Sequence, residues 1–510
     1  MTLNKFILIT SILLSGCLAI FFGKELCWDL ANYHFYNPYA LLHARHKIDY
    51  WPNSNVHQYI NPTIDLLTYF LIQNFTPRMS EFILGAIHGI NLWLLFLIAK
   101  YFLPQKSSTL LAVILALLGM LGPTTLPGIG SFQNDNLISI FVLGFVLLQL
   151  QGYFFFAGVM LGLGLGLKLT AGIYAAGGML AILFTPLSLR SKIKMMMTCG
   201  TGFAIGMLIT SGYWMWMMWS EHHNPLFPFF NSLFHSPDFA MTDWRDTRFL
   251  PKNLLQTIFF PFYFSFDGRT ADAPFRDFRF AVVYGLVVMI GAKLGKKAFP
   301  RWGKAFLLSF FLLSYLIWQF YFSIARYLAP LEMLAPLMIY LLLRMLMKHT
   351  LTFYTSLSAI FLALMLTLSP IPMIRAPWYD TTFFNVQLPA SLPDQATVLI
   401  AYPAYVLNTN PRPQSYLIPF FPAKWRFIGI PLLNEKLFLD AAAMNIIQSK
   451  LNQRTEKMYL LTSDRNMPEL LKAAFNFHLA PDGECEKIYS DRQAVTHQNV
   501  LLCPIVQTQA

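Results

Sequence analysis

Long apolar runs, separated by short polar gaps, dominate the first 370 of the chain's 510 residues. An α-helix needs about 20 apolar residues to cross the hydrocarbon core of a bilayer. The first run follows Lys5 and has no small-x-small cleavage site, so we expect a retained helix and not a removed signal peptide. The pattern predicts eleven membrane-spanning helices, at residues 6–22, 80–99, 107–126, 136–152, 153–169, 170–187, 195–218, 279–292, 305–323, 327–343 and 350–370.

The charges between these runs predict the orientation of the helices. Alternate gaps hold Lys and Arg without Asp or Glu, as the gap with Arg344 and Lys348 does. Such gaps lie in the cytoplasm by the positive-inside rule, which predicts a cytoplasmic N-terminus and an external C-terminus. Two outer loops, 24–78 and 220–278, are long and rich in aromatic residues and proline. The apolar stretches inside these loops are too short to span and are expected to form interfacial helices, at 66–75 and 254–264.

After residue 370 the composition becomes polar enough for a soluble domain, 371–510. The predicted topology places this domain on the external side of the membrane, which is the periplasm in a bacterial-type cell. There Cys485 and Cys503 can form a disulfide or remain two thiols. The predicted fold class is thus an all-α polytopic membrane domain, 1–370, followed by a small periplasmic α/β domain. That domain is predicted to have strands at 397–401, 458–461 and 500–502 and helices at 434–450 and 468–475.

Composition narrows the function further. Only 12% of the residues are charged and 56% are hydrophobic, whereas a soluble domain has roughly 25% charged residues. The net charge of +12 does not indicate nucleic acid, because the basic residues lie largely in the gaps that membrane topology requires. Gly158, Gly162 and Gly166 have small-xxx-small spacing inside an apolar run, which predicts close helix packing and not a nucleotide loop.

Asp29 is the first candidate for chemistry, because it follows the first helix inside a segment dense in polar and aromatic residues. On an α-helix it shares one face with Asn32, Tyr33 and Tyr36. A carboxylate held at a partly dry boundary can serve as a general base. The structural alternative is a helix N-cap or a snorkelling surface aspartate.

Four charged residues lie near the outer ends of the predicted helices: Asp135, Lys168, Arg326 and Glu332. Charges at the membrane edge are costly and indicate function. Lys168 and Arg326 are suited to an anionic phosphate, which Arg binds bidentately and Lys binds as a point charge. In the structural alternative, Arg326 pairs with Glu332 or Asp135 and only fixes the helix positions.

Five short segments carry a resemblance to a known family, and together they extend over about 300 residues: 28–34, 59–65, 166–170, 224–228 and 326–332. With them the chain resembles the GT-C superfamily of membrane glycosyltransferases. More narrowly, it resembles bacterial membrane proteins grouped with the family 87 enzymes that use polyprenyl-phosphate mannose.

This resemblance implies a GT-C fold and transfer of a sugar from a polyprenyl-phosphate donor on the outer face of the inner membrane. Direct attack opposite the phosphate would invert the anomeric carbon. The acidic base of the family maps to Asp29, with His34 as a nearby orienting or phosphate-binding group. Substrate binding is expected from Asn32, Tyr33, Tyr36, His57, Asn61, Lys168, Arg326 and Glu332.

Many members of the superfamily carry a paired acidic motif associated with a metal, whereas Leu30 follows Asp29 here. We therefore expect a metal-independent reaction without a cofactor, with Asp49 left as a possible second acid and a divalent metal left as an alternative that the spacing does not support. The expected partners are the lipid-linked donor, a lipid or glycan acceptor and membrane lipids, and no nucleic acid. Two alternative functions are a transporter or flippase for a lipid-linked saccharide and a non-catalytic protein of surface-polysaccharide assembly.

Overall fold

The computed structural model describes residues 2–50, 55–104, 108–242, 245–294, 301–373, 375–378, 381–404, 415–433, 436–437, 441–462, 471–472, 475–481, 483–490 and 500–507. The chain forms two compact units. The first comprises Met1–Gly23, Glu81–Tyr213 and Arg245–Met373, and the second comprises Lys24–Ser80, Trp214–Trp244 and Ile374–Ala510. These units divide the chain differently from the predicted boundary at residue 370, because the whole of the first predicted outer loop, 24–78, and part of the second, 220–278, belong to the same unit as the C-terminal residues.

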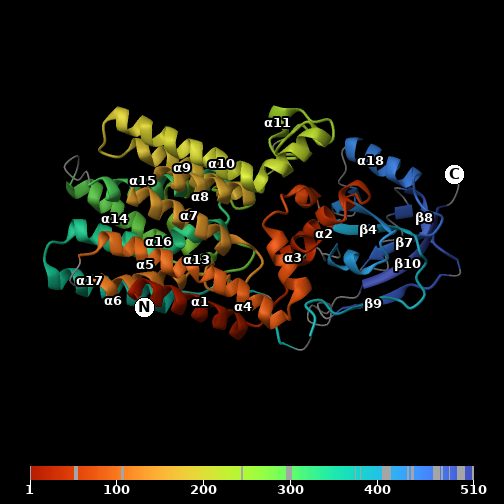
Figure 1. Cartoon of the computed structure of the whole chain (residues 1–510), viewed down its shortest axis with the longest axis horizontal. Coiled ribbons are helices and arrows are strands. Elements are labelled where there is room, and N and C mark those ends of the chain that lie inside the picture. Colours follow the sequence, from red (N-terminus) through yellow and green to blue (C-terminus); the bar gives the residue numbers. More distant parts are fainter. Residues whose placement is uncertain are drawn as a thin grey trace. The chain divides into compact units, whose positions relative to one another are not determined.

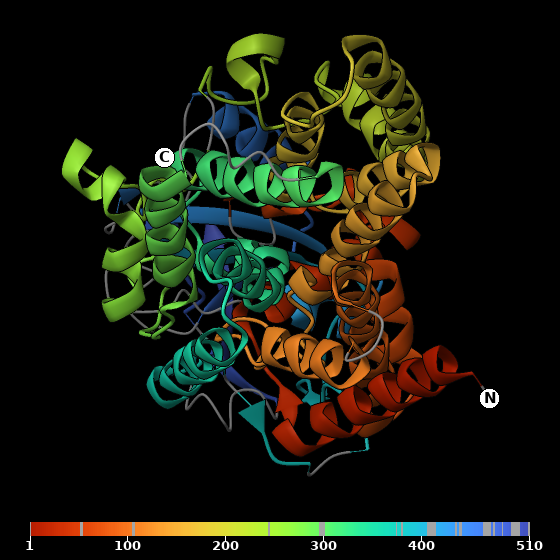
Figure 2. The same ribbon diagram turned by 90° about the vertical axis from the view of Figure 1, so that its left-hand side faces the viewer.

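The first unit is helical (Figure 1). Its elements are α1 (Leu3–Phe22), α4 (Pro77–His88, shared with the second unit), α5 (Ile90–Phe102), α6 (Ser108–Met120), α7 (Asp135–Gln151), α8 (Phe154–Leu167), η4 (Leu169–Ala171), α9 (Gly172–Leu183), α10 (Leu189–His222, also shared), α12 (Leu254–Ile258), α13 (Phe260–Asp267), α14 (Arg279–Leu294), α15 (Trp302–Tyr321), η6 (Ala325–Leu328), α16 (Ala329–Leu346) and α17 (Thr350–Thr367). Almost every residue of α16 is buried, and α16 packs on α5, α6, α7, α14, α15 and α17 (Figure 2).

The long apolar helices identify a membrane protein. Among the described residues, six helices are long and apolar enough to cross a bilayer: Leu3–Phe22, Pro77–Phe102, Leu189–His222, Trp302–Tyr321, Ala325–Leu346 and Thr350–Thr367. Four further apolar helices have only 10–17 residues: Thr109–Met120, Asp135–Gln151, Phe154–Leu167 and Leu169–Leu183. Each of the eleven predicted segments thus corresponds to a helix, but the count of eleven spans stays a prediction.

Two interruptions explain the short helices. Gly152 ends α7 with a φ of 87°, a left-handed conformation that glycine adopts at little cost. Lys168 is extended and ends α8, after which a 3₁₀ turn leads into α9. The predicted close packing of the glycine run is confirmed, because a Cβ at Gly158 would clash with the carbonyl of Cys199 on α10, and one at Gly162 with that of Phe203. The predicted interfacial stretches are helical too, as α3 (Asp65–Asn74) and as α12 with α13.

The second unit contains a β-sheet with short helices. Its elements are β1 (Lys24–Glu25), η1 (Leu30–His34), α2 (Tyr36–Leu42), η2 (Arg45–Lys47), η3 (Asn55–Tyr59), α3, α11 (Asn231–Phe234), β2 (Arg375–Ala376), β3 (Val386–Gln387), β4 (Thr397–Ala404), η7 (Ser415–Phe420), β5 (Arg426–Leu433), β6 (Lys436–Leu437), α18 (Ala441–Asn452), β7 (Met458–Thr462), β8 (Phe477–Leu479), β9 (Glu486–Ser490) and β10 (Val500–Gln507). The strand order is β3-β9-β10-β7-β4-β5-β6, and β8 also pairs with β10. Strand β4 runs parallel to β5 and β7, whereas the other pairings are antiparallel.

All three predicted strands of the C-terminal domain are confirmed, as β4, β7 and β10. The helix predicted at 434–450 begins only at Ala441, because Lys436 and Leu437 pair with β5 as a short antiparallel strand. Whether a short segment forms a strand depends on the partner strand in the folded protein, so a helical periodicity in the sequence does not exclude strand pairing. The helix predicted at 468–475 lies mainly outside the described residues.

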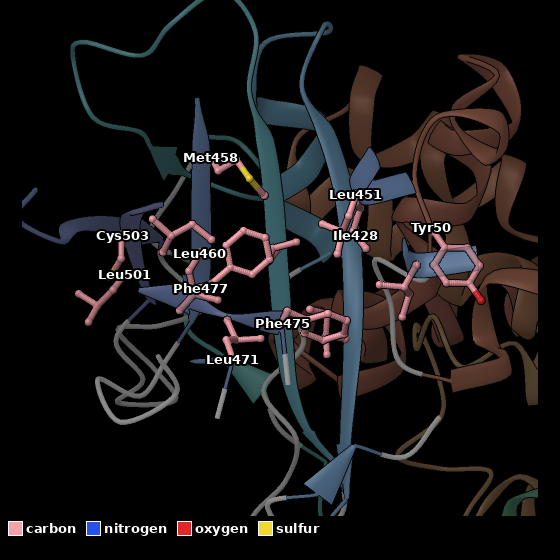
Figure 3. Packing of buried hydrophobic residues seen from close by; sticks show 14 of the residues in the cluster. Tyr50, Ile428, Leu451, Met458, Leu460, Leu471, Phe475, Phe477, Leu501 and Cys503 are labelled. Atoms are coloured by element: carbon pink, nitrogen blue, oxygen red, sulfur yellow. The ribbon is translucent and has the colours of Figure 1, made fainter. Parts of the chain in front are cut away.

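Side chains from both ends of the chain build the core beside this sheet (Figure 3). Tyr50 of the first outer loop extends the sheet, since its N–H donates to Phe427 O at 2.8 Å and its carbonyl accepts from Gly429 N at 2.6 Å. Through Tyr50, the loop after the first helix is a structural part of this unit. Within the sheet, Cys485 and Cys503 form a disulfide that joins β10 to the start of β9.

Candidate functional site

The polar segment after α1 forms a π-turn. Residues Leu30–His34 are a π-helix, in which the Phe35 N–H donates to Leu30 O at 3.2 Å. Single π turns are frequent at functional sites. The face predicted for Asp29, Asn32, Tyr33 and Tyr36 assumed α-helical spacing throughout, whereas residues Leu30–His34 have π-helical spacing.

Asp29 is a buried residue at the start of the π-helix. It occupies the N-cap position, but its side chain makes no capping hydrogen bond there. Only 7% of the residue is exposed, so it does not lie at the protein surface. Asn32 in the same turn is also buried, and its carbonyl accepts a hydrogen bond from the Ser415 hydroxyl.

His34 is paired with Asp65. The His34 Nδ1 and Asp65 Oδ1 atoms are 2.7 Å apart, and both side chains are buried. Asp65 begins α3, where the helix dipole favours a negative charge. Asn61 sets up this helix start, because its Oδ1 accepts from the Thr63 N–H at 3.1 Å and from the Thr63 hydroxyl at 2.7 Å. Asn61, predicted to bind substrate, is thus seen as the turn residue that places Asp65.

Aromatic rings surround the π-turn. The Tyr33 ring lies 4.1 Å from that of His34 and stacks on His57 at 4.9 Å. Trp28 meets both Tyr33 and His57 edge-on, at 6.4 and 5.2 Å. Tyr33 is buried, whereas Trp28 and His57 are half-buried, so the cluster reaches the surface through these two rings. We call Trp28, Asp29, Tyr33, His34, His57 and Asp65 the π-turn cluster.

Asp49, the possible second acid, is occupied by structural contacts. Its carboxylate accepts from the Tyr36 hydroxyl at 2.8 Å, from Arg45 Nε and Nη2 at 2.8 and 2.6 Å, and from the Phe427 N–H at 2.9 Å. Arg45 also donates to the carbonyls of Ala423 and Trp425. Burial raises the pKa of Asp49, although Arg45 acts in the opposite direction. Tyr36, predicted to contact substrate, belongs to this network, which fastens the first outer loop to the sheet.

Lys168, Asp135 and Arg326 form a charged cluster in the first unit. Lys168 Nζ lies 2.5 Å from Asp135 Oδ1 and 3.0 Å from Gln133 O, and Arg326 Nε lies 4.0 Å from Asp135 Oδ2. Both cations also sit over the Tyr327 ring, each 5.5 Å from its centroid. All three charged side chains remain partly exposed. Two cations beside one carboxylate leave a net positive charge, as a phosphate site requires.

Glu332 accepts hydrogen bonds from a turn between α6 and α7. Its carboxylate accepts from the N–H of Thr124 at 3.2 Å, from the hydroxyl of Thr124 at 2.8 Å and from the N–H of Thr125 at 2.9 Å. Arg326 pairs with Asp135 in the structure, which matches one half of the structural alternative. The contacts of Glu332 hold the turn at Thr124 and Thr125 in place.

The structure therefore gathers the predicted residues into groups. Tyr33, His34 and His57 are in ring contact in the π-turn cluster, Asp29 stands at the start of the same π-helix, and Lys168 and Arg326 both lie beside Asp135. Asp65 was not singled out as a site residue, although it lies in a segment that carries the family resemblance. No spacing rule links it to His34, but a carboxylate directly after an Asn-Pro turn at a helix start was an available signal.

Metal binding is not decided by these contacts. Among the described residues, no group of three or more His, Cys, Asp or Glu side chains is arranged to hold a metal ion. The Nδ1 atom of His222 lies 2.7 Å from Asp238 Oδ2, and its ring stacks on that of Phe227 at 4.1 Å. The expectation of a metal-independent reaction stays a prediction.

Comparison with known proteins adds no assignment. No family model matches the chain, and no curated protein matches it. The class that the structure itself defines is a helical membrane protein with a disulfide-bonded, β-rich C-terminal region.

Proposed function

We propose that this protein is a glycosyltransferase of the GT-C type. It transfers a sugar from a polyprenyl-phosphate donor to a lipid or glycan acceptor on the outer face of a bacterial inner membrane. The observation that carries the proposal is the π-turn cluster, where a buried carboxylate, a carboxylate-paired imidazole and aromatic rings converge in one short turn. Enzymes use such buried acid–base groups to move protons, and aromatic rings are common walls of ligand sites.

Asp29 is the general base in this proposal. It takes the proton of the acceptor hydroxyl, whose oxygen attacks the anomeric carbon of the donor. The bond from that carbon to the phosphate oxygen breaks, and its electron pair leaves with the polyprenyl phosphate.

Lys168 and Arg326 are assigned to the donor phosphate. Support comes from their partial exposure and from the excess of positive charge around Asp135. Lys168 lies at the break between α8 and the following 3₁₀ turn, a position where side chains of interrupted membrane helices commonly meet ligands.

The outer location and the eleven-helix topology belong to the same proposal. The Cys485–Cys503 disulfide supports an external C-terminal domain, because disulfides persist in oxidising compartments such as the periplasm. Cytoplasmic nucleotide sugars do not reach that side, so a lipid-carried donor is required.

The test is sugar transfer by the purified protein in nanodiscs, with a panel of radiolabelled undecaprenyl-phosphate hexoses and pentoses. Asp29→Asn should lower kcat about 10²–10⁴-fold, the usual worth of a general base. Asp272→Asn, a change at a well-exposed aspartate, is the matched control and should transfer normally. Absence of transfer by the wild type from every donor, or undiminished transfer by a folded Asp29→Asn protein, would refute the proposal.

A further inference from the structure

A groove lies between α14 and α16, two neighbouring helices of the first unit. Its volume of about 400 Å³ is within the range of about 300–1,000 Å³ that ligand pockets occupy. Leu286 and Leu343 are buried in it, whereas Met289, Ala292 and Lys293 are exposed, so the groove is open to the surroundings of the helices. Six of the seven lining residues are apolar and one is a lysine: Leu286, Met289, Ala292, Lys293, Leu343, Leu346 and Met347.

The groove lies at the C-terminal ends of both helices. At their N-terminal ends, Arg279 Nη1 of α14 donates to Glu332 O of α16 at 3.3 Å, so the two helices run in the same direction. About 20 Å separates Glu332 from Leu346 along α16, which is most of the thickness of a hydrocarbon core. Arg326 precedes α16, so the groove and the charged cluster around Asp135 lie near opposite membrane surfaces. By the positive-inside rule, the groove lies near the predicted cytoplasmic surface.

The charge beside the groove is positive. Lys293 is in the last turn of α14, and its ammonium has no ion pair or hydrogen bond with any residue that the structure describes. Lys348, also exposed, directly follows the lining residue Met347. Helices α14, α15 and α17 contain no Asp or Glu, and Glu332 is the only acidic residue of α16. No carboxylate of these four helices therefore competes for a lysine at the groove.

We infer that this groove binds an anionic phospholipid of the leaflet at that end of the helices. One acyl chain lies along the apolar side chains between α14 and α16, and the phosphate lies beside Lys293. Phospholipid chains are the apolar molecules that surround a membrane helix, and basic pockets between membrane helices on the cytoplasmic side are known to take anionic head groups. The site is independent of the proposed sugar transfer, because it lies at the other membrane surface.

The lysine is the reason to expect an anionic lipid and not a zwitterionic one. Both kinds of lipid bury the same acyl chain, so the apolar lining does not discriminate between them. A choline head group carries its own cation, which offsets the attraction of its phosphate to a lysine, whereas a glycerol head group carries none. One lysine near a membrane surface favours an anionic lipid by about fivefold in affinity.

Photocrosslinking in nanodiscs tests the site directly. Phosphatidylglycerol and phosphatidylcholine that carry the same diazirine-labelled acyl chain are the two probes, and mass spectrometry locates the crosslinked residues. In the wild type, crosslinks should fall on groove residues such as Met289 and Leu346, with about fivefold more from phosphatidylglycerol. Lys293→Gln should reduce the phosphatidylglycerol yield to that of phosphatidylcholine. Lys194→Gln, at an exposed lysine of α10, is the matched control and should leave both yields unchanged.

Two further arms examine the apolar part and the source of the phosphate. Ala292→Phe places a ring in the groove and should lower the crosslinks from both lipids, and thermal unfolding in detergent checks that each variant is folded. Unlabelled phosphatidylglycerol should compete with the probe, whereas glycerol 3-phosphate, which has no acyl chain, should not. Equal yields from the two lipids, an unchanged yield in Lys293→Gln, an equal loss in Lys194→Gln, or competition by glycerol 3-phosphate would each overturn the inference.

Discussion

Asp49→Asn removes the negative charge at the centre of the network that fastens the first outer loop to the sheet. The carboxylate accepts four hydrogen bonds, from Tyr36, Phe427 and, twice, Arg45. Only 2% of Asp49 and 3% of Arg45 are exposed, so the change leaves a guanidinium buried without its counter-charge. Breaking a buried ion pair in this way costs about 3–5 kcal/mol.

For a unit of this size, 1 kcal/mol corresponds to about 2–4 °C in Tm, so Asp49→Asn should lower the Tm of the second unit by about 6–20 °C. Thermal unfolding of detergent-purified protein, followed by circular dichroism in the β-sheet region, measures the shift. Asp394→Asn, an exposed position of the same unit, is the matched control and should change Tm by less than about 2 °C. If the two variants unfold at the same temperature, the network does not stabilise the fold as argued.

A double-mutant cycle sharpens this test. Burial raises the pKa of Asp49 despite the nearby charge of Arg45, so the ion pair does not fully offset the cost of removing the carboxylate from water. Asp49→Asn should therefore cost about 1–3 kcal/mol less in an Arg45→Met background than in the wild type. Equal costs in both backgrounds would show that the two residues act independently.

Two further outcomes are expected. Burial, followed by the charge of Asp49, raises the pKa of Tyr36 well above its usual value, so above about pH 10 the unfolded chain loses this proton while the folded one keeps it. Stability should therefore fall more steeply with rising pH in the wild type than in Tyr36→Phe, and parallel unfolding curves between about pH 9 and 11 would contradict this. Gly162→Ala should destabilise the protein by about 1–3 kcal/mol, because its Cβ would clash with Phe203 O, whereas Gly200→Ala, which has open space, should be neutral or stabilising. Thermal unfolding of the two variants measures this difference, and equal effects would argue against tight packing at Gly162.

Much of the helical architecture could be predicted from the local pattern, because a membrane-spanning helix is recognised by the apolar character of about 20 consecutive residues. The interruptions at Gly152 and Lys168 lie at the predicted helix joins, and the glycine run packs as its spacing indicated. Strand β5 was missed and β6 was taken for helix. Short strands depend on partners elsewhere in the chain, which local periodicity does not contain.

For the candidate site too, some features could be proposed from the sequence and others needed the structure. Asp29 and His34 were proposed as site residues from the sequence, because charged and polar groups just after an apolar helix are conspicuous. The π-helix that follows Asp29 and contains His34 was not foreseen, since a helical pattern implies α spacing until a backbone shows otherwise. The pairing of His34 with Asp65 needed coordinates as well, because the two residues belong to different elements.

By itself, the sequence determined that this is a membrane protein, where its apolar helices lie and which acid after the first helix merits attention. All of these follow from the composition of contiguous segments. Only the tertiary structure decided that the first long loop packs with the C-terminal sheet. It also showed that Asp49 links this loop to the sheet through hydrogen bonds, and that His34 pairs with Asp65. Each of these depends on contacts between residues distant in the chain, and such contacts arise from burial and hydrogen bonding in the folded protein rather than from any local pattern.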